Sequence, residues 1–202
     1  MSSPKQLYDY LPAFIVGVIE GLIVILSIFC FLLARGVDTP LIFIYSGITL
    51  LFIAALLAAG AYYTRKEEMD NSGGESKILK IYQSLDIDEQ LKKAMVDDTV
   101  QENKVWEKEW QEGGNATSSL MPKQYALSMF WGFLTGGIII LINNYLMQLP
   151  SYTALLIPFL LLAALGFYKY KLSNQKPVNG MLLISLSGIA AAVGAYYAGG
   201  FF

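Results

Sequence analysis

Histidine is absent from this chain, and cysteine occurs once, at Cys30. A single cysteine excludes an intramolecular disulfide and any CxxC motif, and the lack of histidine removes the commonest transition-metal ligand. Any metal site must therefore use oxygen ligands, helped at most by methionine. An enzyme is disfavoured as well, because the apolar segments hold no paired nucleophile and base, so we expect no catalytic residues.

Charge is scarce too. Charged residues make up 15% of the 202 residues, against 55% hydrophobic residues, and the mean hydropathy is +0.48. Such a composition lies outside the range of soluble globular proteins. Five apolar segments are each about long enough to cross ~30 Å of hydrocarbon as a helix. They are residues 11–34, 40–63, 125–147, 152–168 and 178–197. The sequence therefore predicts an all-α integral membrane protein with five transmembrane helices and a small helical cytoplasmic insert after the second.

Basic residues predict the orientation. Nine of the fourteen Lys and Arg residues lie between Arg65 and Lys123, and three more lie between the fourth and fifth segments. Loops rich in Lys and Arg stay in the cytoplasm, which places the N-terminus inside and the C-terminus outside. The chain then divides into a first transmembrane hairpin (1–64), a cytoplasmic acidic insert (65–123) and transmembrane helices 3 to 5 (124–202).

Glu20 is the one charged residue inside any of the five apolar segments. It lies about 15 Å from the start of the first helix at about 1.5 Å per residue, close to the bilayer midplane. A carboxylate there costs at least about 2.5 kcal/mol and is a functional-site candidate. Gly17 and Gly21 flank it with the spacing that lets membrane helices approach closely. We expect these glycines to pack the first helices of two subunits together; the alternative is packing against spans of the same subunit.

The first and third segments resemble each other. Residues 15–26 align without gaps with residues 130–141. The alignment pairs Gly17 with Gly132, Glu20 with Thr135, and Gly21 with Gly136. It indicates either a parallel repeat of two hairpins, as in some transporters, or a chance likeness between short apolar stretches. Asn143 and Asn144, late in the third segment, are candidates for oxygen ligands near the outer exit or for an interface.

The insert between the second and third segments holds thirteen of the sixteen acidic residues. Apolar residues recur there at helical spacing, and Asp86 with Glu89 matches a capping box, so we expect a helical domain. Clustered carboxylates suit hard or borderline divalent cations when thiolate and imidazole are missing. The candidate metal ligands are Glu67, Glu68, Asp70, Glu75, Glu102, Glu109 and Glu112. The alternative, which charge runs in general favour, is a solvated helical surface.

Three motifs, in this order, resemble the vacuolar iron transporter (VIT) family. Gly17-Val-Ile-Glu-Gly-Leu22 resembles the GxxDGL signature of its first helix. Gly60-Ala-Tyr-Tyr-Thr-Arg-Lys-Glu-Glu68 resembles the glycine-rich end of its second helix, and Ser84-Leu-Asp-Ile-Asp-Glu-Gln-Leu91 resembles the start of its metal-binding helices. The resemblance covers almost the whole chain, as a divergent member. Thr49 and Leu57 stand where the family often has an acid and a methionine.

The resemblance implies a homodimeric exporter that moves ferrous iron, and sometimes manganese, out of the cytoplasm in exchange for protons. Glu20 would then replace the family's usual Asp at the centre of a pathway between subunits, and the insert would collect metal. Fe(II) or Mn(II) would be the transported ion, with no tightly bound cofactor. The expected partners are a second copy, the lipid bilayer, divalent metal ions and protons, with no nucleic acid.

Two questions stay open at this point. A membrane scaffold or metal-binding homologue that does not transport, and that acts through the insert, is the alternative function. The expected location is a prokaryotic cell membrane, with a vacuole-type membrane as the alternative.

Overall fold

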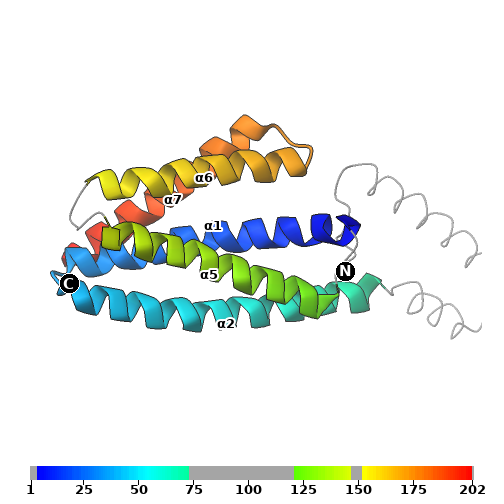
Figure 1. Cartoon of the computed structure of the whole chain (residues 1–202), viewed down its shortest axis with the longest axis horizontal. Helices are drawn as coiled ribbons and strands as arrows, with labels where there is room; N and C mark the ends of the chain where they lie inside the picture. The colour runs from blue at the N-terminus through cyan, green and yellow to red at the C-terminus, as the bar shows by residue number, and fades with distance from the viewer. Residues whose placement is uncertain (1–3, 73–120, 147–151, 202) are drawn as a thin grey trace, which may run out of the picture. The chain divides into compact units, whose positions relative to one another are not determined.

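The structure, a computed structural model, describes residues 4–72, 121–146 and 152–201. Within these ranges 93% of the residues are helical and none lies in a strand. The helices are α1 (Pro4–Ala34), α2 (Thr39–Ser72), α5 (Pro122–Leu146), α6 (Tyr152–Leu172) and α7 (Pro177–Phe201), shown in Figure 1. All five are long and apolar enough to span a membrane. The prediction of an all-α protein with five spans is thus confirmed.

The chain divides into two units, which we describe separately. One contains Met1–Tyr62 and Leu120–Phe202, and therefore holds α1, most of α2, α5, α6 and α7. The other is Tyr63–Ser119, of which the structure describes the end of α2 up to Ser72. Most of the predicted acidic insert, including the candidate ligands Glu75, Glu102, Glu109 and Glu112, lies outside the described residues.

Local sequence signals account for the helix ends. Pro122 and Pro177 open α5 and α7, where proline's fixed φ suits the first turn and its missing N–H costs nothing. After α1, Gly36 adopts φ +67°, and the N–H of Val37 donates to the carbonyl of Leu32 at 3.2 Å. Asn174 plays the same part after α6 with φ 52°. These left-handed residues cap the helix ends and turn the chain back towards the bundle.

Several helices are longer than the apolar segments that predicted them. α2 continues from Tyr63 to Ser72 through Arg, Lys and Glu residues, which are good helix formers and need no hydrocarbon around them. α6 runs through Pro158 to Leu172, and Pro12 lies inside α1 in the same way. Apolar length therefore predicts the part of each helix that suits a membrane, while the helix itself extends into polar sequence.

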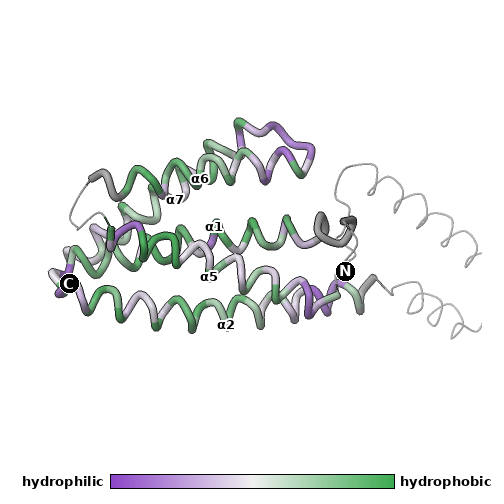
Figure 2. The backbone as a smooth tube through the Cα atoms, in the orientation of Figure 1, coloured by the Kyte–Doolittle hydropathy of each residue, from purple (hydrophilic) through white to green (hydrophobic). Residues whose placement is uncertain are grey.

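The core of the bundle forms around α1. This helix packs against α5, α6 and α7, and the buried share of its span (56%) is the largest of the five. Fully buried side chains include Leu22 and Ile25 of α1, Phe133 and Ile140 of α5, and Leu162 of α6. Hydrophobic residues run through the middle of each helix, and hydrophilic ones gather at turns such as that between α6 and α7 (Figure 2).

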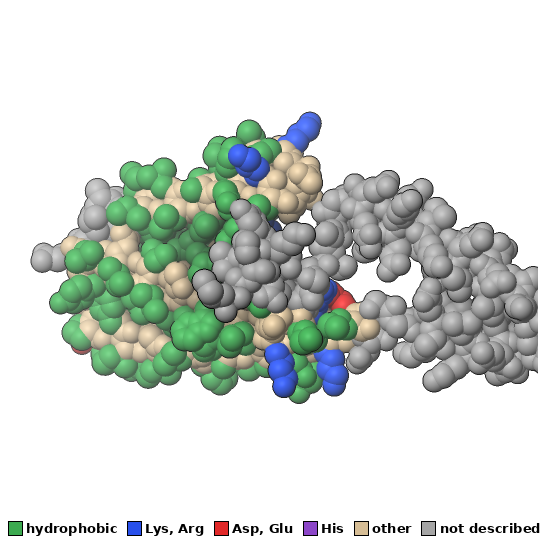
Figure 3. All heavy atoms as spheres, turned by 45° about the vertical axis from the view of Figure 1, so that its right-hand side comes forward, with side chains coloured by type: hydrophobic (Ala, Val, Ile, Leu, Met, Phe, Trp, Pro, Cys, Tyr) green, Lys and Arg blue, Asp and Glu red, His purple; other side chains and the backbone are tan. Residues whose placement is uncertain are grey.

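The outer surface of the helices is also apolar. Large hydrophobic side chains such as Phe52 of α2, Leu160 of α6 and Leu183 of α7 are more than half exposed. Figure 3 shows hydrophobic side chains over much of the described surface in that view, with Lys and Arg towards its margins. Such a surface suits lipid and not water, as a membrane-embedded bundle requires.

Candidate transport site

Glu20 is an exposed residue of the central helix. Between Ala13 and Ala34, all residues of α1 except Glu20 are buried or half-buried. It lies ten residues after Tyr10, where the span of α1 begins, which is about 15 Å along the helix. Val16 and Val24, one turn before and after it, are half-buried on the same face. Among the described residues, the structure therefore presents a carboxylate near the middle of the span on the least covered strip of α1, which is formed by Val16, Glu20 and Val24.

Gly17 and Gly21 do not share this strip. A Cβ added to Gly17 would meet the carbonyl oxygen of Met129 and lie 3.1 Å from the Cα of Gly132 on α5. One added to Gly21 would meet the carbonyl oxygen of Phe133. Both glycines are buried against α5 of the same chain, which corresponds to the second of the two packings that the sequence allows, packing against a span of the same subunit. Their lack of side chains lets two backbones within one subunit approach closely.

The contact between α1 and α5 is reciprocal. A Cβ added to Gly132 would meet the carbonyl oxygen of Phe14, which mirrors the contact of Gly17 with Met129. A Cβ added to Gly136 would meet the carbonyl oxygen of Val18, which mirrors the contact of Gly21 with Phe133. Within each of these two sets, one contact is the counterpart of the other under the internal alignment, once the alignment is extended by one residue to Phe14 and Met129. The two helices also run in the same direction, because Gly17 lies opposite Gly132 and Gly21 opposite Phe133. The repeat in the sequence thus corresponds to a local pseudo-twofold axis along the bundle.

This pseudo-symmetry separates Glu20 from its counterpart. A twofold rotation about an axis parallel to the helices sends equivalent side chains to opposite faces of the helix pair. Glu20 and Thr135 are equivalent, so Thr135 faces away from the strip that carries Glu20. Thr135 is exposed, and its hydroxyl donates to the carbonyl of Trp131 at 2.8 Å.

The five apolar segments offer Glu20 no second acid from the same chain. No other Asp or Glu lies within the five apolar segments. Thr49, at the position where the resemblance leads one to look for an acid, donates its hydroxyl to the carbonyl of Tyr45 at 2.7 Å. No three Asp, Glu or Cys side chains of the described residues group closely enough to hold a metal ion.

The acidic exit of α2 is partly described. Glu67 and Glu68 are exposed, and Arg65 donates to Oε2 of Glu68 at 2.8 Å, one helical turn away. Asp70 lies in the last turns of α2, and its side chain is not among those described. An exposed pair of this kind contributes only about 0.2–1 kcal/mol, so a divalent cation can compete with Arg65 for Glu68.

Buried polar residues of α2 and α5 form a feature that the sequence only partly indicates. Ser46 is fully buried, and Asn143 and Asn144 are 7% and 2% exposed. Within the described part of the chain, the Ser46 hydroxyl and Nδ2 of Asn144 have no hydrogen-bond partner. Two adjacent asparagines in an apolar segment can be recognised from the sequence as unusual, whereas a single serine such as Ser46 is common there and does not indicate a buried polar site.

The described residues form one central helix with an exposed carboxylate near its middle and four further helices long and apolar enough to cross a membrane, an arrangement typical of a multi-pass membrane protein of the transporter type. A model of the VIT family matches residues 64–200, which is more than half of the chain. The chain therefore belongs to the VIT family, whose members transport metal ions and are not enzymes. The match begins after Glu20, so membership rests on the rest of the chain. No curated protein matches the sequence.

Proposed function

We propose that this protein exports divalent metal, ferrous iron above all and manganese as a second substrate, from the cytoplasm by exchange with protons. The pathway lies between two copies of the chain and is centred on Glu20. The observation that carries the proposal is the exposure of this carboxylate at midplane depth in a VIT family chain. Membership of the family supports metal transport, and we infer that Glu20 is the residue at which metal transport is coupled to proton movement.

A second subunit accounts for the open strip. A carboxylate facing hydrocarbon is unfavourable by several kcal/mol, so the strip with Glu20 must meet protein or water. One carboxylate balances half the charge of a divalent ion, and the five apolar segments hold no other acid. Twofold symmetry between two copies supplies a second Glu20, and the two carboxylates together balance both charges of the metal ion.

Proton coupling follows from the chemistry of the same group. A carboxylate binds either a proton or a metal ion, so the pair of Glu20 side chains can take up protons when the metal leaves. Oxygen ligands accept both Fe(II) and Mn(II), and the chain has no histidine to favour other metals. The acidic residues at the end of α2 and in the insert bind metal before it enters the pathway.

Transport in proteoliposomes tests the proposal. Vesicles are loaded with a metal-sensitive dye and a pH dye, and Fe(II) or Mn(II) is added outside. The wild-type protein is expected to carry metal inward and protons outward together. Glu20→Gln removes the charge and keeps the shape, so both signals should fall to the level of empty vesicles. Glu20→Asp keeps a carboxylate and should retain part of the flux.

Thr135→Val is the matched control, because Thr135 is the repeat counterpart of Glu20 at the same depth on the opposite face. It should transport at the wild-type rate. Full flux in Glu20→Gln contradicts the proposal. If the wild-type protein itself carries no metal but binds it in detergent, the chain is the non-transporting homologue that acts through its insert.

A further inference from the structure

A groove lies between the beginnings of α1 and α5. It has a volume of about 450 Å³ and is lined by Tyr10, Leu11 and Phe14 of α1 and by Gln124, Leu127, Ser128 and Trp131 of α5. Most of its wall is apolar, and polar atoms come from Tyr10, Gln124 and Ser128. The volume lies within the range of about 300–1,000 Å³ that is usual for small-molecule sites.

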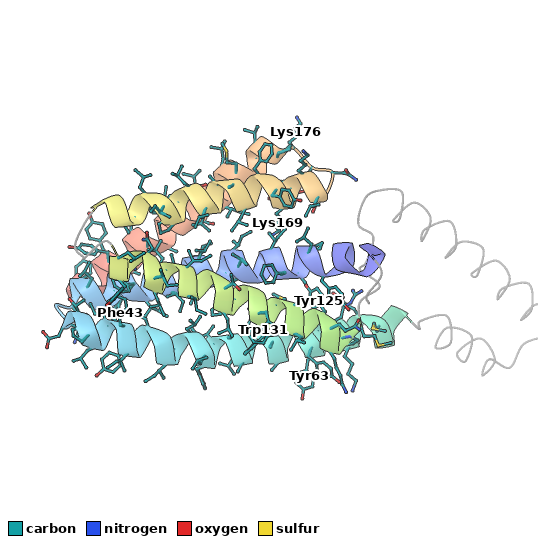
Figure 4. The ribbon with its side chains drawn as sticks, in the orientation of Figure 1. Phe43, Tyr63, Tyr125, Trp131, Lys169 and Lys176 are labelled. Atoms are coloured by element: carbon teal, nitrogen blue, oxygen red, sulfur yellow. The ribbon has the colours of Figure 1, made fainter. Side chains whose placement is uncertain are left out.

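The groove faces the surroundings of the bundle. Leu127 and Trp131 are 58% and 55% exposed, and Trp131 projects from the side of α5 (Figure 4). Both spans that form the groove are membrane helices, so an apolar hollow at this depth is filled by hydrocarbon or protein and not by water. An acyl chain matches its apolar wall, and the polar residues suit the ester level of a lipid.

A basic residue stands beside it. Lys123 precedes the lining residue Gln124 in the first turn of α5 and is exposed. In the described part of the chain it has no acidic partner. Lys169 and Lys176 mark the same end of the bundle in Figure 4, the end that the sequence predicts to be cytoplasmic. A single juxtamembrane lysine attracts an anionic headgroup by about 1 kcal/mol.

The groove and Glu20 lie on different faces of the α1–α5 pair. Leu127 and Trp131 lie two turns and one turn before Thr135 on one face of α5. Pseudo-symmetry places Thr135 and Glu20 on opposite faces of the α1–α5 pair. A second subunit that covers Glu20 therefore leaves Trp131 facing lipid.

We propose that this groove binds an anionic phospholipid, with an acyl chain between Phe14 and Trp131 and the headgroup at Lys123. Aromatic walls and a terminal cation distinguish it from the convex surface of the other helices, which any lipid can coat. The site is independent of the transport reaction.

Fluorescence quenching tests this assignment. Trp106→Phe and Trp110→Phe in the full chain leave Trp131 as the one tryptophan. The protein in zwitterionic nanodiscs is titrated with small mole fractions of phosphatidylglycerol or phosphatidylcholine whose acyl chains carry bromine. Phosphatidylglycerol should reach half-maximal quenching at about a fivefold lower mole fraction, as expected for one lysine near an anionic headgroup.

Two variants and one control complete the experiment. Lys123→Gln should abolish the preference for phosphatidylglycerol, and Ser128→Phe, which fills the groove, should reduce quenching by both lipids. Lys176→Gln, at the same end of the bundle, should leave the preference intact. Equal quenching by the two lipids in the wild-type background overturns the proposal, and so does an equal effect of Lys176→Gln. Absence of quenching also overturns it, because another segment or a second copy then covers Trp131.

Discussion

Glycine at four positions brings the backbones of α1 and α5 into contact. Replacement of Gly17 by alanine places a Cβ against the carbonyl oxygen of Met129, a backbone atom that cannot rotate away. The helices must then separate, and we expect a cost of about 1–3 kcal/mol, as for other overpacked cores. The midpoint of thermal unfolding in detergent should fall.

Gly60→Ala is the control for this substitution. Nothing lies within 4 Å of a Cβ added there, and alanine is the better helix former. The midpoint should stay constant or rise. A Gly17→Ala variant as stable as Gly60→Ala contradicts the close contact between α1 and α5.

Glu67 and Glu68 differ in what they offer a metal ion. Glu68 is held by Arg65, whereas Glu67 is exposed one residue earlier on the helix. Arg65→Gln releases Glu68 and should tighten Mn(II) binding, by no more than about fivefold because an exposed pair contributes at most about 1 kcal/mol. Glu67→Gln should weaken binding. Titration of the full protein with Mn(II), with free ion followed by electron paramagnetic resonance, measures both.

Joint replacement of Glu67, Glu68, Glu109 and Glu112 by glutamine extends this test to the insert. If these residues deliver the ion, as we propose, Mn(II) affinity should fall, and transport should slow at low metal but recover at saturating metal. Unchanged affinity in the quadruple variant identifies them as a solvated surface.

At the scale of the helices, the number and type of elements could be predicted because an apolar run long enough to cross a bilayer has one favourable conformation there. The ends could not be predicted from hydropathy, since α2 continues to Ser72 through residues that form helix equally well in water. The partner of Gly17 and Gly21 was also beyond the reach of their spacing. A small-xxx-small motif predicts a close approach but does not identify the second helix.

The internal repeat could have indicated which helix packs against Gly17 and Gly21. Gly132 and Gly136 have the same spacing as Gly17 and Gly21, and the two pairs face each other in the structure. A motif present in both copies of a repeat is thus a candidate for contact between the copies. The exposure of Glu20 was less accessible to sequence reasoning, because it depends on which sides of α1 the helices α5, α6 and α7 cover.

At the scale of the whole molecule, an odd number of spans places the two ends of the chain at opposite ends of the bundle. α1 begins at the end where α6 leads into α7, and α7 finishes at the other (Figure 1). With the basic residues at the first end, the cytoplasmic N-terminus and external C-terminus remain the orientation that we expect. Two copies with one orientation bring their Glu20 residues to the same depth.

Cysteine crosslinking locates the surface between the two copies. Val16 and Val24 share the face of Glu20, so in a Cys30→Ala background Val16→Cys and Val24→Cys should each form disulfide-linked dimers in membranes. Gly17→Cys is unsuitable, because Gly17 is packed against α5 within the chain. Thr135→Cys is the matched control at the depth of Glu20, and it should remain monomeric because its face is turned to lipid. Efficient dimers through Thr135→Cys, with none through Val16→Cys or Val24→Cys, would place the second subunit on the opposite face. The two Glu20 carboxylates could not then share one metal ion, and the mechanism would have to work with a single carboxylate per pathway.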